Sequence, residues 1–262
     1  MTAQKSISFD RAATYYDTTR GLTPGAMKKV VGLLTEEIAG RGPCLEVGIG
    51  TGRIGLTLEE AGVDVAGVDL SAAMLGTLVK KAGGSPPFPL AVADATRLPF
   101  PDATFEVCLA CHVFHLIPEW KSALREMARV LRPHGTILVD PGSASEAENE
   151  REQVMDEFAR LAGYSNERAG VKDGGEIDEE MRSRGAVVRL LPAVSDEKRG
   201  SLEELIHGLE KGIYSITWQA SDLALRAAGR AVRPWARRRF GELTEVGSWE
   251  WTVQWRAYEL PG

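Results

Sequence analysis

The chain has 262 residues, a formal net charge of −6 and 44% hydrophobic residues. These values are typical of a globular protein of one or two domains, and they exclude a disordered or low-complexity chain. The acidic balance provides no general attraction to nucleic acid, so we do not expect such a partner. Three cysteines are too few, and odd in number, for a disulfide scaffold.

No apolar segment is long enough to span a membrane, and the first twenty residues lack the apolar stretch of a signal peptide. We therefore expect a cytoplasmic protein without a membrane span, present as a monomer or a homodimer.

Short apolar runs alternate with longer amphipathic runs through the first half of the chain, as in βαβ units. The runs that we expect to form strands are residues 43–49, 63–68, 90–93, 105–111 and 136–140. The helices expected between them are residues 53–61, 71–81 (with Ser71 as the N-cap) and 119–131. Right-handed crossovers would join these units into a parallel sheet with helices on both faces.

The second half of the chain has a different pattern. The helices expected there are residues 145–163, 176–184 and 201–240, and residues 186–191 are an expected strand. In residues 249–257 (WEWTVQWRA), apolar side chains occupy alternate positions, which is the period of a strand. We expect this last strand to join the edge of the sheet in the antiparallel direction.

Three glycines occupy alternate positions in residues 46–52 (EVGIGTG), directly after an expected buried strand. Glycine allows a sharp backbone turn and a close approach of a ligand to the main chain. In an open parallel sheet, such a ligand lies at the carboxyl ends of the strands. Residues 50–55 also match the GxGxxG fingerprint, and Asp69 after the next strand suits a ribose. Both a dinucleotide and another nucleoside cofactor fit this pattern.

Glu46 lies two positions before the first glycine. A carboxylate there would repel a pyrophosphate at the start of a helix, whereas it would attract a cofactor that carries a sulfonium. Glu46 therefore favours a sulfonium cofactor, with a strand-end carboxylate bonded to backbone amides as the alternative.

The ordered segments of the first half resemble the class I S-adenosylmethionine (SAM) dependent methyltransferases. Residues 44–55 (CLEVGIGTGRIG) resemble motif I of this family, and residues 67–75 (GVDLSAAML) resemble its second motif. Residues 93–107 resemble the acidic turn after strand three, and residues 124–135 resemble the helix and turn before strand five. Residues 9–21 are similar to the lid of the small-molecule branch of the family.

The resemblance implies an α/β fold with a Rossmann-like, doubly wound sheet, mostly parallel with an antiparallel edge strand, plus a helical cap. The implied parts are lid helices at 1–40, a SAM-binding core at 41–142, a cap with one core strand at 143–248 and an edge strand at 249–262.

The resemblance also implies SAM as the cofactor and methyl transfer to a small-molecule acceptor, on an oxygen, nitrogen or carbon atom. Asp69 would bind the ribose, and Asp94 with the amide of Ala95 would bind the adenine edge. The implied cofactor residues are Tyr16, Arg20, Glu46, Gly48, Gly50, Thr51, Gly52, Asp69, Leu70, Met74, Asp94, Ala95 and Cys111. The residues of the cap expected to line the acceptor pocket are Ile213, Tyr214, Trp218 and Phe240. The alternatives are an NAD(P)-dependent oxidoreductase and a non-catalytic SAM-binding partner protein.

Cys108, Cys111 and His112 match a haem attachment pattern, and with His115 they offer four side chains of the types that bind zinc. The two cysteines would face opposite sides of a strand, so we expect no metal. Both histidines follow strand four, where the acceptor meets the methyl donor in this fold. With Tyr16 they are the catalytic candidates, and packing is the alternative role.

A run of arginines recurs at helical spacing near the end of the chain. Its members are Arg226, Arg230, Arg233 and Arg237, followed by Arg238 and Arg239. The stripe fits a phosphate, a carboxylate substrate or an RNA backbone, or a solvated helix face paired with the acidic residues at 146–157 and 173–180. We expect Pro234 to disturb this helix.

Overall fold

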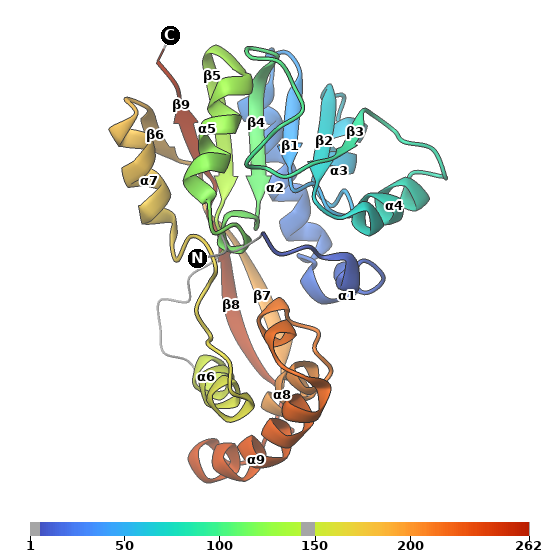
Figure 1. Cartoon of the computed structure of the whole chain (residues 1–262), viewed down its shortest axis with the longest axis vertical. Helices are drawn as coiled ribbons and strands as arrows, with labels where there is room; N and C mark the ends of the chain where they lie inside the picture. Colours follow the sequence, from blue (N-terminus) through green and yellow to red (C-terminus); the bar gives the residue numbers. More distant parts are fainter. Residues whose placement is uncertain (1–5, 143–149, 262) are drawn as a thin grey trace. The chain divides into compact units, whose positions relative to one another are not determined.

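The computed structural model describes residues 6–142 and 150–261, which fold into two compact units (Figure 1). The sheet unit comprises Met1–Ser143, Ala169–Val194 and Thr252–Gly262, and the helical unit comprises Ala144–Arg168 and Ser195–Trp251. The helical unit is interrupted, because the chain returns to the sheet unit at Ala169–Val194, a stretch that contains the one core strand expected within 143–248.

Among the described residues, the sheet of the first unit has seven strands. They are β1 (Cys44–Val47), β2 (Val65–Asp69), β3 (Leu90–Val92), β4 (Phe105–Cys111), β5 (Leu131–Asp140), β6 (Val187–Leu190) and β9 (Arg256–Glu259). The helices of this unit are α1 (Tyr16–Arg20), α2 (Pro24–Ile38), α3 (Gly55–Glu60), α4 (Ala72–Lys81), α5 (Trp120–Val130) and α7 (Gly174–Ser183), with the short turns η1 (Asp10–Ala12) and η2 (Phe114–Leu116).

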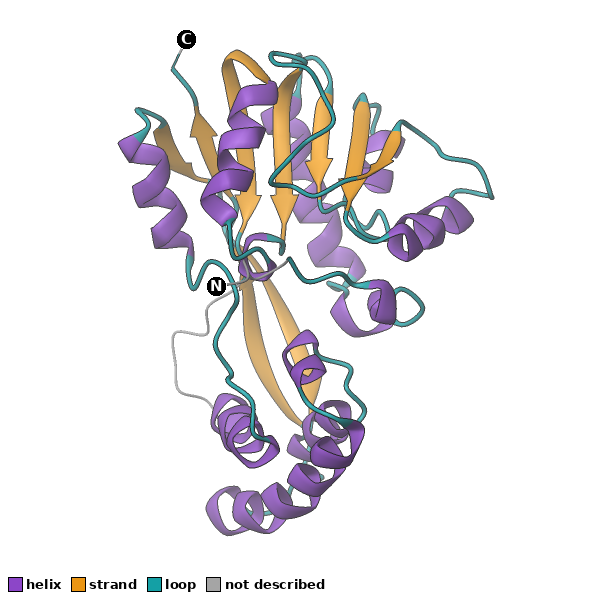
Figure 2. Ribbon diagram, viewed as in Figure 1, coloured by secondary structure: helices purple, strands orange, loops and turns teal. Residues whose placement is uncertain are grey.

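The strand order is β3-β2-β1-β4-β5-β9-β6, and the first five strands in this order run parallel. Helices cover both faces of the sheet (Figure 2). The order reverses between β1 and β4, and this switch point is where ligands bind in open α/β sheets. The expected Rossmann-like fold is confirmed.

The carboxyl-terminal strand of the sheet differs from the prediction. Residues 249–253 alternate in burial as expected, but they belong to β8 (Gly247–Val253), which pairs with β7 (Val194–Gly200) in a separate two-stranded sheet. The antiparallel strand of the main sheet is β9, and it lies between β5 and β6 rather than at the edge. The period of a strand predicts which face is buried but not which sheet it joins.

The helical unit contains α6 (Glu150–Ala162), α8 (Leu202–Glu210), the short turn η3 (Ser215–Gln219) and α9 (Asp222–Phe240). Residues 145–149 of the expected helix at 145–163 lie outside the described residues. The three helices share a core of their own. Helix α9 does not end at Pro234, and Val232 and Ala236 on either side of the proline are fully buried in that core.

Local signals explain why the helices next to the site begin where they do. Ser71 caps α4, and its hydroxyl accepts a hydrogen bond from the amide of Met74 at 3.1 Å, so the predicted N-cap is confirmed. Thr23 caps α2 in the same way, and Pro24 occupies the first turn. No helix among the described residues has the length and hydropathy of a membrane span.

Candidate functional site

A cleft of about 650 Å³, its open mouth included, lies at the carboxyl ends of β1, β2, β3 and β4. The predicted site residues that line it are Tyr16, Gly48, Gly50, Asp69, Leu70, Met74, Asp94, Ala95, Cys111 and His112. These residues come from five separate segments of the sheet unit, which the fold brings to one edge of the sheet. The lining side chains that we did not predict are mainly apolar: Ile7, Phe9, Val113, Leu116 and Ile117.

The turn after β1 is built from main chain. Gly48, Gly50 and Gly52 all have positive φ angles, of 72°, 57° and 77°. A Cβ atom at Gly48 would overlap the side chain of Val113 in the cleft wall, and one at Gly50 would lie 3.2 Å from Met74 Cε. Gly52 instead faces apolar side chains of α3 and α4, so its role in the structure is internal packing.

Two carboxylates at the ends of β2 and β3 flank this turn. Asp69 accepts hydrogen bonds from the amides of Gly50 and Ser71, both at 2.8 Å, one on each oxygen. Burial raises the pKa of Asp69, whereas the bonds from the two amides lower it. Asp94 accepts two bonds from Thr96 on Oδ1, which fixes the direction of its carboxyl group. Each carboxylate keeps acceptor capacity for a ligand in the cleft.

Glu46 does not line the cleft. Its side chain is buried on β1, and its Oε2 atom has no hydrogen-bond partner among the described residues. Burial raises the pKa of Glu46 to about 8, against the opposing charge of Arg53. Burial thus favours the protonated form of this carboxyl group, and the attraction of Glu46 for a sulfonium stays a prediction.

Thr51 is buried and links the amino-terminal lid to the glycine turn. Its hydroxyl donates to Asp17 Oδ1 on α1 at 2.6 Å, and Lys81 bridges Asp17 (2.9 Å) and the Thr51 carbonyl (3.0 Å). A second tie joins Asp10 of η1 to the Ser71 hydroxyl at 2.6 Å. No local sequence signal identifies these ties, because their partners lie far apart along the chain.

The lid itself brings two aromatic rings to the cleft. Tyr16 packs edge to face on Phe9, with ring centroids 5.8 Å apart, and both residues line the cleft. The side chain of Arg20, at the end of α1, lies outside what the structure describes.

The two candidate histidines are separated by the fold. His112 lines the cleft, whereas His115 lies in η2 outside the lining, and its carbonyl accepts a bond from Gly170. His112 has a φ of 55°, which is uncommon for a residue with a side chain and is found at functional positions more often than elsewhere. The structure therefore distinguishes the histidines, where the sequence treated them alike.

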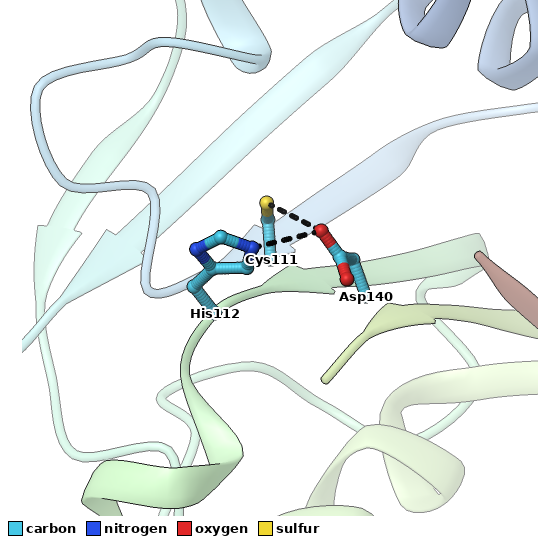
Figure 3. Close-up of side chains that lie close together, drawn as sticks. All are labelled: Cys111, His112 and Asp140. Carbon is cyan, nitrogen blue, oxygen red and sulfur yellow. Dashed lines mark hydrogen bonds and ion pairs between the residues drawn. The ribbon is translucent and has the colours of Figure 1, made fainter. Parts of the chain in front are cut away.

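His112 belongs to a cluster of polar side chains at the ends of β4 and β5 (Figure 3). Its Nε2 lies 3.0 Å from Asp140 Oδ2, and Cys111 Sγ lies 3.8 Å from the same oxygen. The guanidinium of Arg53 lies 3.6 Å from that sulfur. Asp140 is buried and was not predicted, because only the pairing of β4 with β5, in which Cys111 faces Asp140, brings it here.

Charges in this cluster are balanced by its neighbours. Burial acts to raise the pKa of Asp140, but the hydrogen bond from His112, together with the Gly142 amide and Arg53, holds that pKa below its ordinary value. Burial and the nearby Asp140 charge raise the pKa of Cys111, so it is a neutral thiol. Asp140 is a carboxylate and Arg53 a cation.

Cys111, His112 and Asp140 offer ligand atoms within 4.8 Å of one another and are of types that bind transition metals. The Arg53 guanidinium beside the sulfur would repel a divalent cation at this place. The absence of a metal therefore stays our prediction.

Two of the six arginines, Arg233 and Arg239, bind side chains of the helical unit's own helices, and the other four are exposed. Arg233 binds Glu210 and Glu203 of α8 at 2.7 Å each, rather than the acidic segments that we expected as partners. Arg239 donates to Gln153 of α6 and stacks near Trp235. Tyr214 and Phe240, expected in the acceptor pocket, pack against the core of this unit. The acceptor-pocket role of the predicted cap residues stays a prediction.

Comparisons with known proteins agree with the sequence resemblance. Residues 45–139 match the family model of a methyltransferase domain. The chain is 39% identical over 101 residues to a phosphatidylethanolamine N-methyltransferase of Cereibacter sphaeroides, in a match that covers 37% of this chain and 49% of that protein. It is 31% identical over 161 residues to a demethylmenaquinone methyltransferase of Mycolicibacterium paratuberculosis, covering 59% and 68%.

Solved structures share the fold. The YcgJ protein of Bacillus subtilis superposes with a TM-score of 0.60 at 17% identity, covering 90% of this chain and all of that one. Phosphoethanolamine N-methyltransferase 2 of Haemonchus contortus, solved with S-adenosylhomocysteine (SAH), has a TM-score of 0.55 at 17% identity, covering 97% of this chain and 58% of that one.

The fold, the glycine turn and these matches together define the class of the protein. The chain belongs to the class I SAM-dependent methyltransferases, a family of enzymes, and SAM is its cofactor. Neither an NAD(P)-dependent oxidoreductase nor a non-catalytic SAM-binding protein finds support in the comparisons.

Proposed function

We propose that the chain transfers the methyl group of SAM to a small, partly apolar acceptor. The observation that carries this proposal is the cleft at the switch point, where the glycine turn, Asp69, Asp94 and His112 meet. The turn leaves its main chain open to a ligand, and the two carboxylates offer acceptors at its two ends.

In this proposal, Asp69 accepts hydrogen bonds from the ribose hydroxyls, and Asp94 accepts one from the adenine amine beside the Ala95 amide. Leu70 and Met74 pack on the adenine ring. Tyr16 of the lid lies toward the sulfonium, and Arg20 binds the methionine carboxylate. The cofactor supplies an electrophilic methyl group, and the chain's contribution is to orient an acceptor in line with it and to exclude water.

The acceptor class rests on the lining. Apolar side chains line much of the cleft that also contains His112, so the acceptor carries an apolar body with one reacting polar group. They include Ile7, Phe9, Val113, Leu116 and Ile117. The names of the two relatives, which refer to a phospholipid and a quinone, fit an acceptor of that kind. A cytoplasmic location, a monomeric or homodimeric state and the lack of a nucleic-acid partner complete the proposal.

Calorimetry with SAH tests the cofactor site, with NADH as the matched control ligand. SAH is expected to bind and to raise the free energy of unfolding by about 2.7 kcal/mol at a hundredfold its Kd, whereas NADH leaves the melting temperature unchanged. Binding of NADH and not of SAH would overturn the proposal. Methyl transfer from labelled SAM to a panel of phenols, amines and thiols then tests the activity, and SAH binding without transfer to any of them favours a non-catalytic role.

A further inference from the structure

The two ring nitrogens of His112 have different surroundings. Nε2 faces the Asp140 carboxylate at 3.0 Å. Figure 3 shows Nδ1 on the opposite side of the ring, away from Asp140. His112 lines the cleft, and its side chain is 21% exposed, whereas that of Asp140 is 3% exposed. In this pair the carboxylate of Asp140 is buried, whereas the imidazole of His112 is accessible from the cleft.

The hydrogen bond determines which nitrogen carries the proton. An ionised carboxylate only accepts hydrogen bonds, so Nε2 must be the donor. In a neutral imidazole with a protonated Nε2, Nδ1 has a lone pair and accepts a proton. Asp140 is itself fixed, because its Oδ1 atom accepts from the Gly142 amide at 3.0 Å. The backbone adds a further constraint, since the His112 amide donates to the Asp140 carbonyl at 2.9 Å.

The charges around the pair favour one class of acceptor. Arg53 contributes a positive charge beside Cys111, the Cys111 thiol is neutral, and Asp140 contributes a single negative charge. When His112 takes up a proton, this cluster becomes positive. A positive cluster stabilises a neighbouring oxyanion and disfavours an ammonium group, so a hydroxyl compound suits the site better than an amine.

We propose that Asp140 holds His112 in the Nε2-protonated tautomer, so that Nδ1 removes the proton of an acceptor hydroxyl during methyl transfer. The O–H bond breaks and its proton goes to Nδ1, while the oxygen forms a bond to the methyl carbon. The carbon–sulfur bond of the sulfonium breaks, and its electron pair stays on sulfur. His112 is the catalytic residue and Asp140 a positioning residue. This inference rests on the proposed function.

The tautomer can be measured without knowing the natural acceptor. Long-range 1H–15N spectra of the imidazoles, near neutral pH and with SAH bound, report which nitrogen of each histidine carries the proton. The signal of His112 is assigned by its loss in His112→Asn, since asparagine tolerates a positive φ. We expect an Nε2-protonated ring in the wild type and a mixture of tautomers in Asp140→Asn. A ring protonated on Nδ1 in the wild type overturns the inference.

The base role is tested with para-substituted phenols of graded acidity as probe acceptors. Loss of the base in His112→Asn is expected to lower kcat about 100-fold for the least acidic phenol and progressively less for the more acidic ones, with SAH affinity unchanged. Asp140→Asn is expected to lower kcat in the same graded manner, with KM changed less than about threefold. A loss that is equal for all phenols, or no loss, overturns the base role.

Two further outcomes distinguish a failure of the base mechanism from a failure of the proposed function. If the wild type binds SAH but methylates none of the phenols, the hydroxyl assignment is wrong while the cofactor site stands. If SAH does not bind at all, the proposed function itself fails. Activity that is abolished by a chelator and restored by zinc would show that the cluster binds a metal, and it would replace the tautomer mechanism.

Discussion

The two halves of the cleft are built by different means. Around the glycine turn, backbone amides hold the carboxylate proposed to bind the ribose, since Asp69 accepts hydrogen bonds from Gly50 and Ser71. Around His112, side chains hold one another, and Asp140 shares a single oxygen between His112 and Cys111. The first half therefore depends on the shape of the main chain, and the second on the identity of side chains. The first half is expected to tolerate most substitutions outside its glycines and its carboxylates.

The largest effect is expected where a side chain would enter the turn. Gly48→Ala adds a Cβ atom that overlaps Val113, at a backbone conformation with φ of 72°. Strain and overpacking together are expected to lower the free energy of unfolding by about 3 kcal/mol. Denaturant unfolding measures this loss.

The matched control for Gly48→Ala is Gly62→Ala. Gly62 also has a positive φ, of 86°, but nothing lies within 4 Å of its added Cβ atom. Only the backbone strain of about 1 kcal/mol is expected there. Equal losses of unfolding free energy in the two variants would mean that the close fit against Val113 does not affect stability. The shape of the main chain would then not be what distinguishes the first half of the cleft.

The next effect concerns binding rather than folding. Asp69→Ala removes the acceptor proposed for the ribose and is expected to weaken SAH binding about 100-fold, which corresponds to about 2.7 kcal/mol. Calorimetry measures this change, with Asp64→Ala on the exposed loop before β2 as the control. If both variants bind SAH as tightly as the wild type, the cofactor lies elsewhere in the cleft.

The contrast between the halves also explains what could be predicted from sequence. The glycine turn, Asp69 and the cap at Ser71 lie in contiguous motifs, since the bond between Gly50 and Asp69 spans only 19 positions. The sheet follows from the alternation of apolar runs. In this half of the cleft, the residues proposed to bind the cofactor lie within sequence motifs that can be recognised locally.

The other half depends on contacts between distant segments. Arg53 meets Cys111 across 58 positions, and Asp140 meets His112 only through the register of β4 and β5. The ties that hold the lid to the glycine turn in the first half, such as Thr51 with Asp17, also join distant segments, across 34 positions. The sequence identified His112 as a candidate but not its partner, and it assigned the last strands to the wrong sheet position, because register and sheet membership are set by tertiary packing.

A smaller effect is expected from Glu46, which links the halves through the charge of Arg53. Its folded-state pKa, about 8, is above the ordinary value of 4.5, so between these values the unfolded chain is ionised while the folded chain keeps the proton. Stability from this group is present at low pH and falls as pH rises through that range, by at most about 1.4 kcal/mol per pH unit.

Glu46→Gln removes this dependence while keeping the shape of the protonated acid. Relative to the wild type, the variant is expected to gain about 2.5 kcal/mol of stability between about pH 5.5 and pH 7.5. Thermal unfolding at the two pH values measures the gain, with the exposed Glu59→Gln as the control. A constant difference between variant and wild type at both pH values would show that Glu46 is ionised in the folded protein.

The smallest effect is expected at the tie between the turn and the lid. Thr51→Val keeps the volume of a side chain that is 1% exposed but removes the 2.6 Å bond to Asp17. The bridge from Lys81 to the Thr51 carbonyl remains, so the loss of stability is expected to be only about 1 kcal/mol.

Because α1 also carries Tyr16 into the cleft, a looser lid is expected to release SAH a few times faster, while the association rate of SAH changes little. Stopped-flow dissociation measures this, with Thr35→Val on α2 as the control, since that hydroxyl bonds only to its own helix. Unchanged dissociation in Thr51→Val would mean that the remaining ties, through Lys81 and through Asp10 with Ser71, are enough to hold the lid, so that the Thr51 hydroxyl does not control the release of the cofactor.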